Sequence, residues 1–269
     1  MVPLRLVATD LDGTIVRSDG TISPRTTKVL NAAVEAGLRV VLVSGRPPRW
    51  VLPVAVTTGL RGPAVCANGA LIYDPVADRV LEAFLLPPER VEAVVRRLRT
   101  ALPDVRFAVE TGGDIYAADG YHGGWHLDGV VQHRPLEDLQ ELAAAKLLVY
   151  HPSMNSDDLL DHVRREISDL AQVTHSNGRN LVEVSARGVN KATTVAYLAQ
   201  RWGIDPSEVV AFGDMPNDVE LLRWAGRGYA MAGAHPSARA AADDLAPGND
   251  DDGVAVVLEG ILAGLPGRS

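Results

Sequence analysis

The sequence has a single cysteine, Cys66, among 269 residues. One cysteine excludes an internal disulfide and a cysteine-rich zinc or iron–sulfur site. No apolar run approaches the roughly 18 residues that a membrane-spanning helix needs. The N-terminal segment reaches a carboxylate at Asp10 too early for a secretory signal peptide. We therefore expect a cytoplasmic protein without a membrane partner.

Positive charge is also scarce. The chain has 26 Lys and Arg residues against 34 Asp and Glu residues, a formal net charge of −8, so we expect no nucleic-acid partner. Only three of the basic residues are lysines, namely Lys28, Lys146 and Lys191. The other proportions, 46% hydrophobic and 22% charged, are those of a folded protein with one large or two modest domains.

Apolar runs alternate with amphipathic segments at both ends of the chain. This alternation predicts an α/β fold in which a doubly wound parallel sheet is built from residues 1–84 and 188–269. Residues 85–187 differ, because helices there interrupt short, half-buried strands. We expect this middle part to be an inserted α+β domain.

Three apolar runs end abruptly in polar residues, at Asp10, Ser44 and Asp214. The carboxyl ends of parallel strands meet at one edge of a sheet, where ligands bind. Carboxylates gathered there are costly to keep ionised without a cation, and an all-oxygen set favours Mg²⁺. Lys191 begins a predicted helix, where the helix dipole disfavours a cation, so either a bound phosphate explains it or it is an exposed lysine at a frayed helix start.

These residues resemble the four ordered motifs of the haloacid dehalogenase-like (HAD) phosphohydrolase superfamily. The motifs are the segment DLDGT at 10–14, Ser44, Lys191 and the segment GDMPND at 213–218. The large insertion between the second and third motifs resembles the Cof-like subfamily, which carries a type IIB α+β cap. The resemblance spans most of the chain and implies a HAD-like core of residues 1–84 and 188–269 with a cap of residues 85–187.

The resemblance implies a magnesium-dependent phosphomonoesterase that acts on a small phosphorylated metabolite, such as a sugar phosphate. Asp10 would be the nucleophile that forms an aspartyl-phosphate, and Asp12 would be the general acid and base. The implied Mg²⁺ ligands, with Asp218 as an outer one, are Asp10, Asp12, Asp214 and Asp218. The implied phosphate-binding residues are Ser44, Gly45, Lys191 and Asn217.

Four of the polar residues near these motifs have two possible interpretations each. Arg46 could contact substrate or pair with an acid of the core, and Asn68 could face the phosphate or turn a hairpin. Asn217 could contact the phosphate or cap a helix. Glu183 either faces the crevice or is a solvated strand residue.

A glycine-rich stretch at 120–129 is the expected source of substrate specificity in the inserted domain. Its larger side chains could stack on a sugar or ring or form hydrogen bonds to it; they are Tyr121, His122, Trp125 and His126. The alternative is that this stretch is a surface or interface loop. His122 and His126 could mimic half a metal site, but the glycines around them oppose the helix that would align them.

Two other classes of function stay open at this point. One is a phosphomutase-type phosphotransferase, which would return the phosphoryl group to a bound sugar. The other is a non-catalytic phosphate-binding module that uses Asp10 as a phosphoacceptor. A dehalogenase is disfavoured, because its chemistry needs neither Asp12 nor a metal. Both a monomer and a homodimer are compatible with the sequence.

Overall fold

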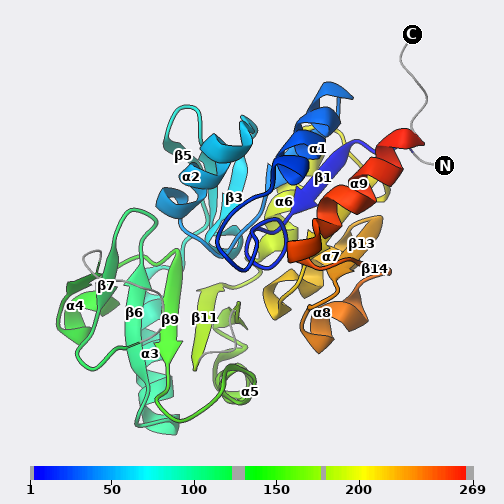
Figure 1. Ribbon diagram of the computed structural model, residues 1–269. Helices are drawn as coiled ribbons and strands as arrows, with labels where there is room; N and C mark the ends of the chain where they lie inside the picture. The colour runs from blue at the N-terminus through cyan, green and yellow to red at the C-terminus, as the bar shows by residue number, and fades with distance from the viewer. Residues whose placement is uncertain (1–2, 123–130, 177–179, 265–269) are drawn as a thin grey trace.

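Three β-sheets and the helices that cover them make up the fold (Figure 1). The computed structural model describes residues 3–122, 131–176 and 180–264. The first sheet has five strands, and all of its neighbouring strands are parallel. In spatial order they are β14 (Asp244–Ala246), β13 (Arg227–Met231), β12 (Val209–Gly213), β1 (Leu6–Thr9) and β2 (Arg39–Leu42).

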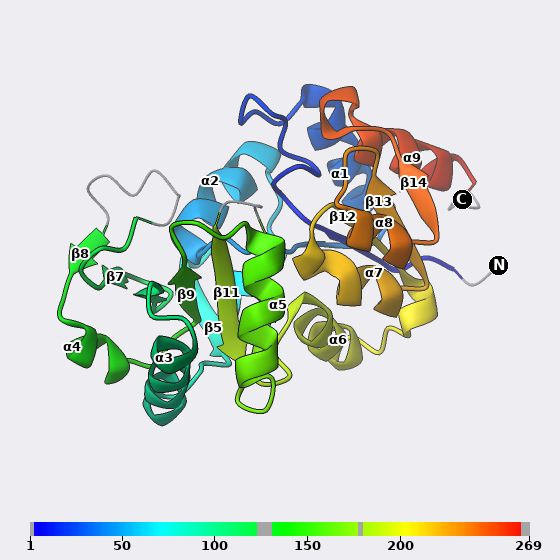
Figure 2. The same ribbon diagram turned by 90° about the horizontal axis from the view of Figure 1, so that it is seen from below.

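Helices cover both faces of this parallel sheet (Figure 2). The helices α1 and α9 pack together on one side, and α6 and α7 pack together on the other. Every residue of β1 is buried, as expected for a strand that is covered on both faces. The helices of this part are α1 (Pro24–Glu35), α2 (Pro48–Thr58), α6 (Lys191–Arg201), α7 (Val219–Trp224), α8 (Pro236–Ala241) and α9 (Gly253–Ala263).

Capping residues set where the helices begin. The Ser23 side chain accepts a hydrogen bond from the backbone N–H of Thr26 at the start of α1, and a proline occupies the first turn. Asn190 and Thr193 form a reciprocal capping box at the start of α6. This cap places Lys191 at the first position of α6 and directs the helix N-terminus toward the edge where the parallel strands end.

The second sheet lies wholly within residues 85–187, which we call the inserted segment. Its six strands, in spatial order, are β10 (Ala171–Thr174), β11 (Leu181–Ala186), β9 (Lys146–Tyr150), β6 (Arg106–Glu110), β7 (Ile115–Ala117) and β8 (Val131–His133). The pairs are antiparallel except β7 with β8. The associated helices are α3 (Pro88–Ala101), α4 (Leu136–Gln140) and α5 (Ser156–Ile167). The segment has an apolar core of its own, so the predicted combination of a parallel α/β sheet and an α+β insertion is confirmed.

The third sheet is a small antiparallel one formed by β3 (Ala64–Cys66), β4 (Leu71–Asp74) and β5 (Arg79–Ala83). A single parallel bridge between Val43 and Val65 joins it to the end of β2. The turn between β3 and β4 has Ala67 and Asn68 in the left-handed region, which the compact Ala67–Gly69 turn requires. This turn places the Asn68 side chain near the carboxyl ends of the parallel strands. None of the described helices has the length and apolar character needed to cross a membrane.

Candidate active site

The side chains that follow the parallel strands meet in one cleft. Thr9 is in register with Phe212 and Leu42, so the residues after β1, β2 and β12 emerge at the same edge. The backbone N–H of Asp10 donates to the carbonyl of Phe212 at 3.0 Å, which continues the ladder past the end of β1. The cleft is lined by Asp10, Asp12, Ser44, Gly45, Arg46, Ser176, Asp214, Met215 and Asn217.

Lys191 lies between two carboxylates at the base of this cleft. Its Nζ is 2.6 Å from Oδ1 of Asp10 and 2.6 Å from Oδ1 of Asp218. Its side chain is only 1% exposed. Burial opposes the charge, but the two carboxylates outweigh burial and raise the pKa of Lys191. The lysine therefore stays a cation, and the reading of Lys191 as an exposed residue at a frayed helix start is wrong.

Three carboxylates gather around this lysine. One oxygen from each of Asp10, Asp214 and Asp218 lies within 4.8 Å of the others. Burial raises the pKa of Asp10 and of Asp214, and the negative neighbours of each add to the effect. A divalent cation would offset this repulsion, and hard carboxylate oxygens are the ligands that Mg²⁺ takes. The donor set thus fits the predicted magnesium ion.

Asp218 differs from the other two carboxylates because both of its oxygens already have partners. Oδ1 accepts from Lys191, and Oδ2 accepts from the backbone N–H groups of Asp214 and Met215 at 3.1 Å each. These bonds hold the loop after β12 in place. Asp218 is therefore suited to orient Asp214 and Lys191 from outside the immediate set of metal ligands.

Gly13 allows the first motif to approach Asp214 closely. Its φ of +72° is in the left-handed region, and a Cβ at this position would lie 2.2 Å from Oδ2 of Asp214. A side chain there would push the loop and the carboxylate apart. The glycine in the first motif is thus required by the contact between the two loops that carry the carboxylates.

Asp12 lies apart from the carboxylate cluster and is held by Arg46. The guanidinium donates from Nε to Oδ2 of Asp12 at 2.8 Å and from Nη2 to Oδ1. The Asp12 side chain is 41% exposed, at the mouth of the cleft. Arg46 thus pairs with the predicted general acid and base at the cleft and not with an acid of the core, and its contact with substrate stays a prediction.

A buried polar chain links the cleft to the inserted segment. Asn217 Nδ2 donates to Asn68 Oδ1 at 2.9 Å, and Asn68 Nδ2 donates to Glu183 Oε2 at 3.0 Å. Glu183 is 1% exposed, so the reading of Glu183 as a solvated strand residue is wrong. Asn217 caps no helix with its side chain, and its Oδ1 has no hydrogen-bond partner within the described residues. Asn68 both turns the hairpin and belongs to this chain.

Lys146 completes the chain and was not among the sequence candidates. Its Nζ donates to the carbonyl of Gly45 at 2.7 Å and forms a close ion pair with Glu183. Burial would raise the pKa of Glu183, but Lys146 and the hydrogen bond from Asn68 outweigh it, so the pKa is lowered. The scarcity of lysine was the signal that could have found Lys146, since the chain has only three.

The two described candidates of the glycine-rich stretch, Tyr121 and His122, are not brought into the cleft. Tyr121 is buried, and its ring packs edge-on against Tyr150, with centroids 6.1 Å apart. His122 is exposed and does not line the cleft. Trp125 and His126 lie outside the described residues. Instead, Ser176 from the inserted segment lines the cleft, and no pattern in the sequence pointed to it.

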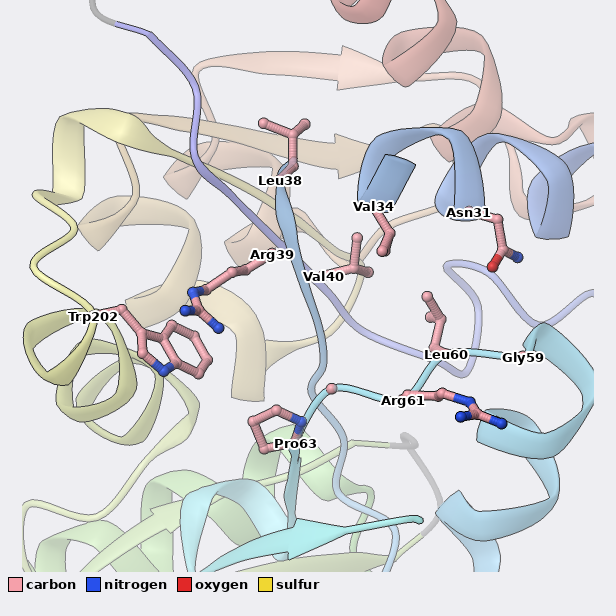
Figure 3. A pocket seen from close by; sticks show the side chains of 11 residues that line it. Asn31, Val34, Leu38, Arg39, Val40, Gly59, Leu60, Arg61, Pro63 and Trp202 are labelled. Carbon is pink, nitrogen blue, oxygen red and sulfur yellow. The ribbon is translucent and has the colours of Figure 1, made fainter. Parts of the chain in front are cut away.

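A second hollow lies at the opposite edge of the parallel sheet, where β2 begins (Figure 3). There the guanidinium of Arg39 stacks over the ring of Trp202 at 4.3 Å from its centroid. Val34, Leu60 and Pro63 lie around it. It contains none of the carboxylates of the motifs, so the cleft at the carboxyl ends of the strands is the candidate active site.

Comparison with known proteins gives consistent matches over nearly the whole chain. A family model of haloacid dehalogenase-like hydrolases matches residues 7–258. The pyridoxal phosphate phosphatase YbhA of Escherichia coli K12 is 27% identical over 265 residues, covering 93% of this chain and 96% of that protein. The 5-amino-6-(5-phospho-D-ribitylamino)uracil phosphatase YbjI of the same organism is 29% identical over 277 residues, covering 96% of each. The solved structure of the HAD subclass IIB sugar phosphatase BT4131 superposes with a TM-score of 0.82 at 21% identity, covering 96% of this chain and 98% of that one.

Proposed function

Because the chain belongs to the family of haloacid dehalogenase-like hydrolases, and is thus an enzyme, we propose that it is a magnesium-dependent phosphomonoesterase acting on a small phosphorylated metabolite. The observation that carries the proposal is the position of Lys191, buried between Asp10 and Asp218 with Asp214 beside them. A buried cation among carboxylates at the edge of a parallel sheet suits the transfer of a phosphoryl group, which depends mainly on positioning and charge stabilisation.

The proposed reaction has two steps. In the first, a carboxylate oxygen of Asp10 attacks phosphorus, the ester P–O bond breaks, and Asp12 gives a proton to the departing alkoxide. In the second, Asp12 takes a proton from a water molecule, which attacks phosphorus and breaks the bond to Asp10. Inorganic phosphate leaves, and Asp10 and Asp12 return to their starting states.

The residues around Asp10 would hold the transferring group. The Ser44 hydroxyl, the Gly45 backbone N–H and the Lys191 ammonium would bind the phosphoryl oxygens. Asn217 would be a further contact through its Nδ2 amide donor, which here bonds to Asn68 Oδ1 at 2.9 Å and lies beside the cleft. Hydrogen-bond donors fixed in advance of the reaction stabilise the charge that develops on the phosphoryl oxygens.

Asp10 and Asp214 would hold Mg²⁺ through their carboxylates and Asp12 through its backbone carbonyl, with Asp218 behind them. When bound, the ion offsets the repulsion between the Asp10 carboxylate and the phosphate dianion. Asp218 would serve this site through its bonds to Lys191 and to the loop after β12.

Arg46 would hold Asp12 until substrate enters. To protonate the leaving group, Asp12 must part from Arg46, take up a proton from solvent and turn toward the departing oxygen. Arg46 lines the same cleft, and it would then face the anionic substrate. Residues 85–187 would act as a cap over the cleft, because Ser176 from this segment lines it and Lys146 contacts Gly45.

The named activities of the relatives guide the choice of substrates to test. YbhA is named for pyridoxal phosphate, and YbjI for a ribitylaminouracil phosphate. Both compounds are phosphate monoesters of small polar molecules. We propose the same broad class for this chain, acting in the cytoplasm as a monomer or a homodimer.

Phosphate release from a panel of metabolites tests the proposal. The panel contains pyridoxal 5′-phosphate, hexose, pentose and triose phosphates and nucleotides, each with Mg²⁺ and with chelator. We expect release that requires Mg²⁺ and is abolished in Asp10→Asn but kept in Asp19→Asn, a control at an exposed aspartate near the same loop. Transfer of phosphate between sugar hydroxyls without release would indicate a mutase instead.

A further inference from the structure

A second cluster of titratable side chains lies outside the candidate active site. It consists of Asp157, His175 and His235, and one ligand atom from each lies within 4.8 Å of the others. Asp157 is in the first turn of α5, and His175 directly follows β10, so both belong to the inserted segment. His235 precedes α8, on the part that carries the parallel sheet. The cluster therefore joins two parts of the fold.

Both imidazoles converge on the one carboxylate. His175 Nε2 is 2.9 Å from Asp157 Oδ1, and His235 Nε2 is 3.3 Å from Asp157 Oδ2. The two rings are nearly perpendicular, with centroids 5.7 Å apart. His175 is 1% exposed, and burial lowers its pKa, which favours the neutral imidazole that binds metals.

We propose that Asp157, His175 and His235 bind a divalent transition metal such as Zn²⁺, and that the ion ties the inserted segment to the part with the parallel sheet. Two imidazole nitrogens and one carboxylate oxygen form the three-ligand set that zinc takes when its fourth position is left to water. The carboxylates around Lys191 instead form an all-oxygen set. The two clusters thus differ in the metals that they favour.

The spacing of the ligand atoms fits such an ion. Tetrahedral zinc with bonds of about 2.0–2.2 Å keeps its ligands roughly 3.3–3.6 Å apart. His235 Nε2 is 3.3 Å from Asp157 Oδ2 and His175 Nε2 is 2.9 Å from Oδ1, so an ion would bind after a small shift of the Asp157 carboxylate. Metal binding replaces the proton on each Nε2 and leaves the ring proton on Nδ1. In His235 this Nδ1 accepts from the Ser237 backbone N–H at 3.2 Å and lies 2.8 Å from the Ser237 hydroxyl. A metal on Nε2 would exchange the backbone bond for one in which Nδ1–H donates to that hydroxyl.

Solvent reaches the cluster from one side. A crevice beside the cluster is lined by Asp157 and His235 together with residues of α5 and α7, among them Asp161 and Glu220. The Asp157 side chain is 62% exposed, whereas that of His235 is 23% exposed. The crevice gives a metal ion a route to the ligands and leaves room for water at its open position.

Zinc binding measured by equilibrium dialysis tests the site. The dialysis contains excess Mg²⁺ to saturate the carboxylates near Lys191, and it compares wild type with His235→Asn, His175→Gln and the control His133→Gln. Asn at 235 keeps an acceptor at the N-cap of α8, and His133 is an exposed histidine on β8. We expect one zinc per chain in wild type and in His133→Gln, and at least tenfold weaker binding in the two cluster variants. If His175→Gln does not fold, the zinc affinity of His235→Asn alone decides whether the cluster binds the ion.

Equal zinc affinity in wild type and His235→Asn would overturn the proposal. Zinc binding that is lost in Asp214→Asn but kept in His235→Asn would place the ion among the carboxylates near Lys191 and would also overturn the proposal.

Thermal unfolding tests whether the ion links the two parts of the fold, because an ion that binds only the folded chain raises its melting temperature. Zinc should raise that temperature in wild type and in His133→Gln but not in His235→Asn. An unchanged temperature in zinc-loaded wild type would contradict the link. None of these measurements depends on phosphatase activity.

Discussion

The Arg46 guanidinium donates to both carboxylate oxygens of Asp12, from Nε to Oδ2 at 2.8 Å and from Nη2 to Oδ1. The pair lies at the mouth of the cleft, while Asp10 lies buried beside Lys191. The two aspartates of the first motif, only two residues apart, therefore have different surroundings. One is held by a buried cation, and the other is paired with a partly exposed arginine. This difference suits a nucleophile and a proton carrier, respectively.

The division of roles predicts unequal effects of substitution at Asp12 and Arg46. General acid and base catalysis contributes about 10²- to 10⁴-fold, so Asp12→Asn should lower kcat by roughly that factor. Arg46→Ala leaves the proton carrier in place and should lower kcat/KM by about tenfold or less, because the ion pair is partly exposed. Steady-state kinetics on the best substrate of the panel measures both. An Arg46→Ala defect as large as that of Asp12→Asn would contradict this assignment.

Removal of the buried cation should weaken both the fold and the reaction. Lys191→Met leaves the Asp10 and Asp218 carboxylates buried without their partner, and breaking a buried ion pair costs about 3–5 kcal/mol. Urea unfolding in chelator should show a loss of this size, while Lys28→Met, at an exposed lysine, should unfold as wild type does. Phosphate release by Lys191→Met should fall at least ~100-fold. A variant as stable and as active as wild type would show that Lys191 is not essential to the site.

The ion pair between Lys146 and Glu183 should behave as a coupled unit. Both side chains are at most 6% exposed, so Lys146→Met or Glu183→Gln alone leaves one buried charge unpaired, at a cost of about 3–5 kcal/mol. The double variant removes both charges and should be more stable than the sum of the single losses by at least ~1 kcal/mol. Urea unfolding of the four proteins gives this coupling. Strictly additive losses would mean that the pair does not stabilise the fold as a pair.

The pH dependence of stability should report the same pair. The pKa of Glu183 is lowered from its ordinary value of 4.5, so the folded chain binds fewer protons than the unfolded chain between the two values. The stabilisation by Glu183 is therefore fully present above pH 4.5 and is lost as the pH falls below it. The difference in unfolding free energy between wild type and Glu183→Gln should be constant near neutral pH and should shrink below pH 4.5. A difference that grows on acidification would mean that the pKa of Glu183 is not lowered in the folded chain.

Much of the candidate site could be predicted from the sequence because of one simple geometric rule. Parallel strands end at a common edge, so Asp10, Ser44 and Asp214 had to lie near one another once their runs were identified as such strands. The predicted helix start at Lys191 is also where α6 begins, and the structure shows that the Asn190 side chain caps it. The roles assigned to these residues stay predictions.

The contacts across the two parts of the fold could not be predicted in this way. Lys146, Ser176 and His175 lie on the inserted segment, and how this segment packs on the parallel sheet depends on many contacts that have no local pattern. Glu183 illustrates the problem, because alternation along a strand cannot tell a face that covers another sheet from a face in solvent. The exclusion of Tyr121 from the cleft has the same origin, since it fills a small apolar cluster of the inserted segment.

The proposed mechanism requires Asp10 to carry the phosphoryl group during turnover. Acid quenching of the working enzyme, followed by peptide mass spectrometry, measures this directly. We expect a phosphoryl group on the peptide that contains Asp10, present with substrate and Mg²⁺ and absent in Asp10→Asn. Steady phosphate release with the phosphoryl group on another residue, or undiminished release by Asp10→Asn, would contradict it.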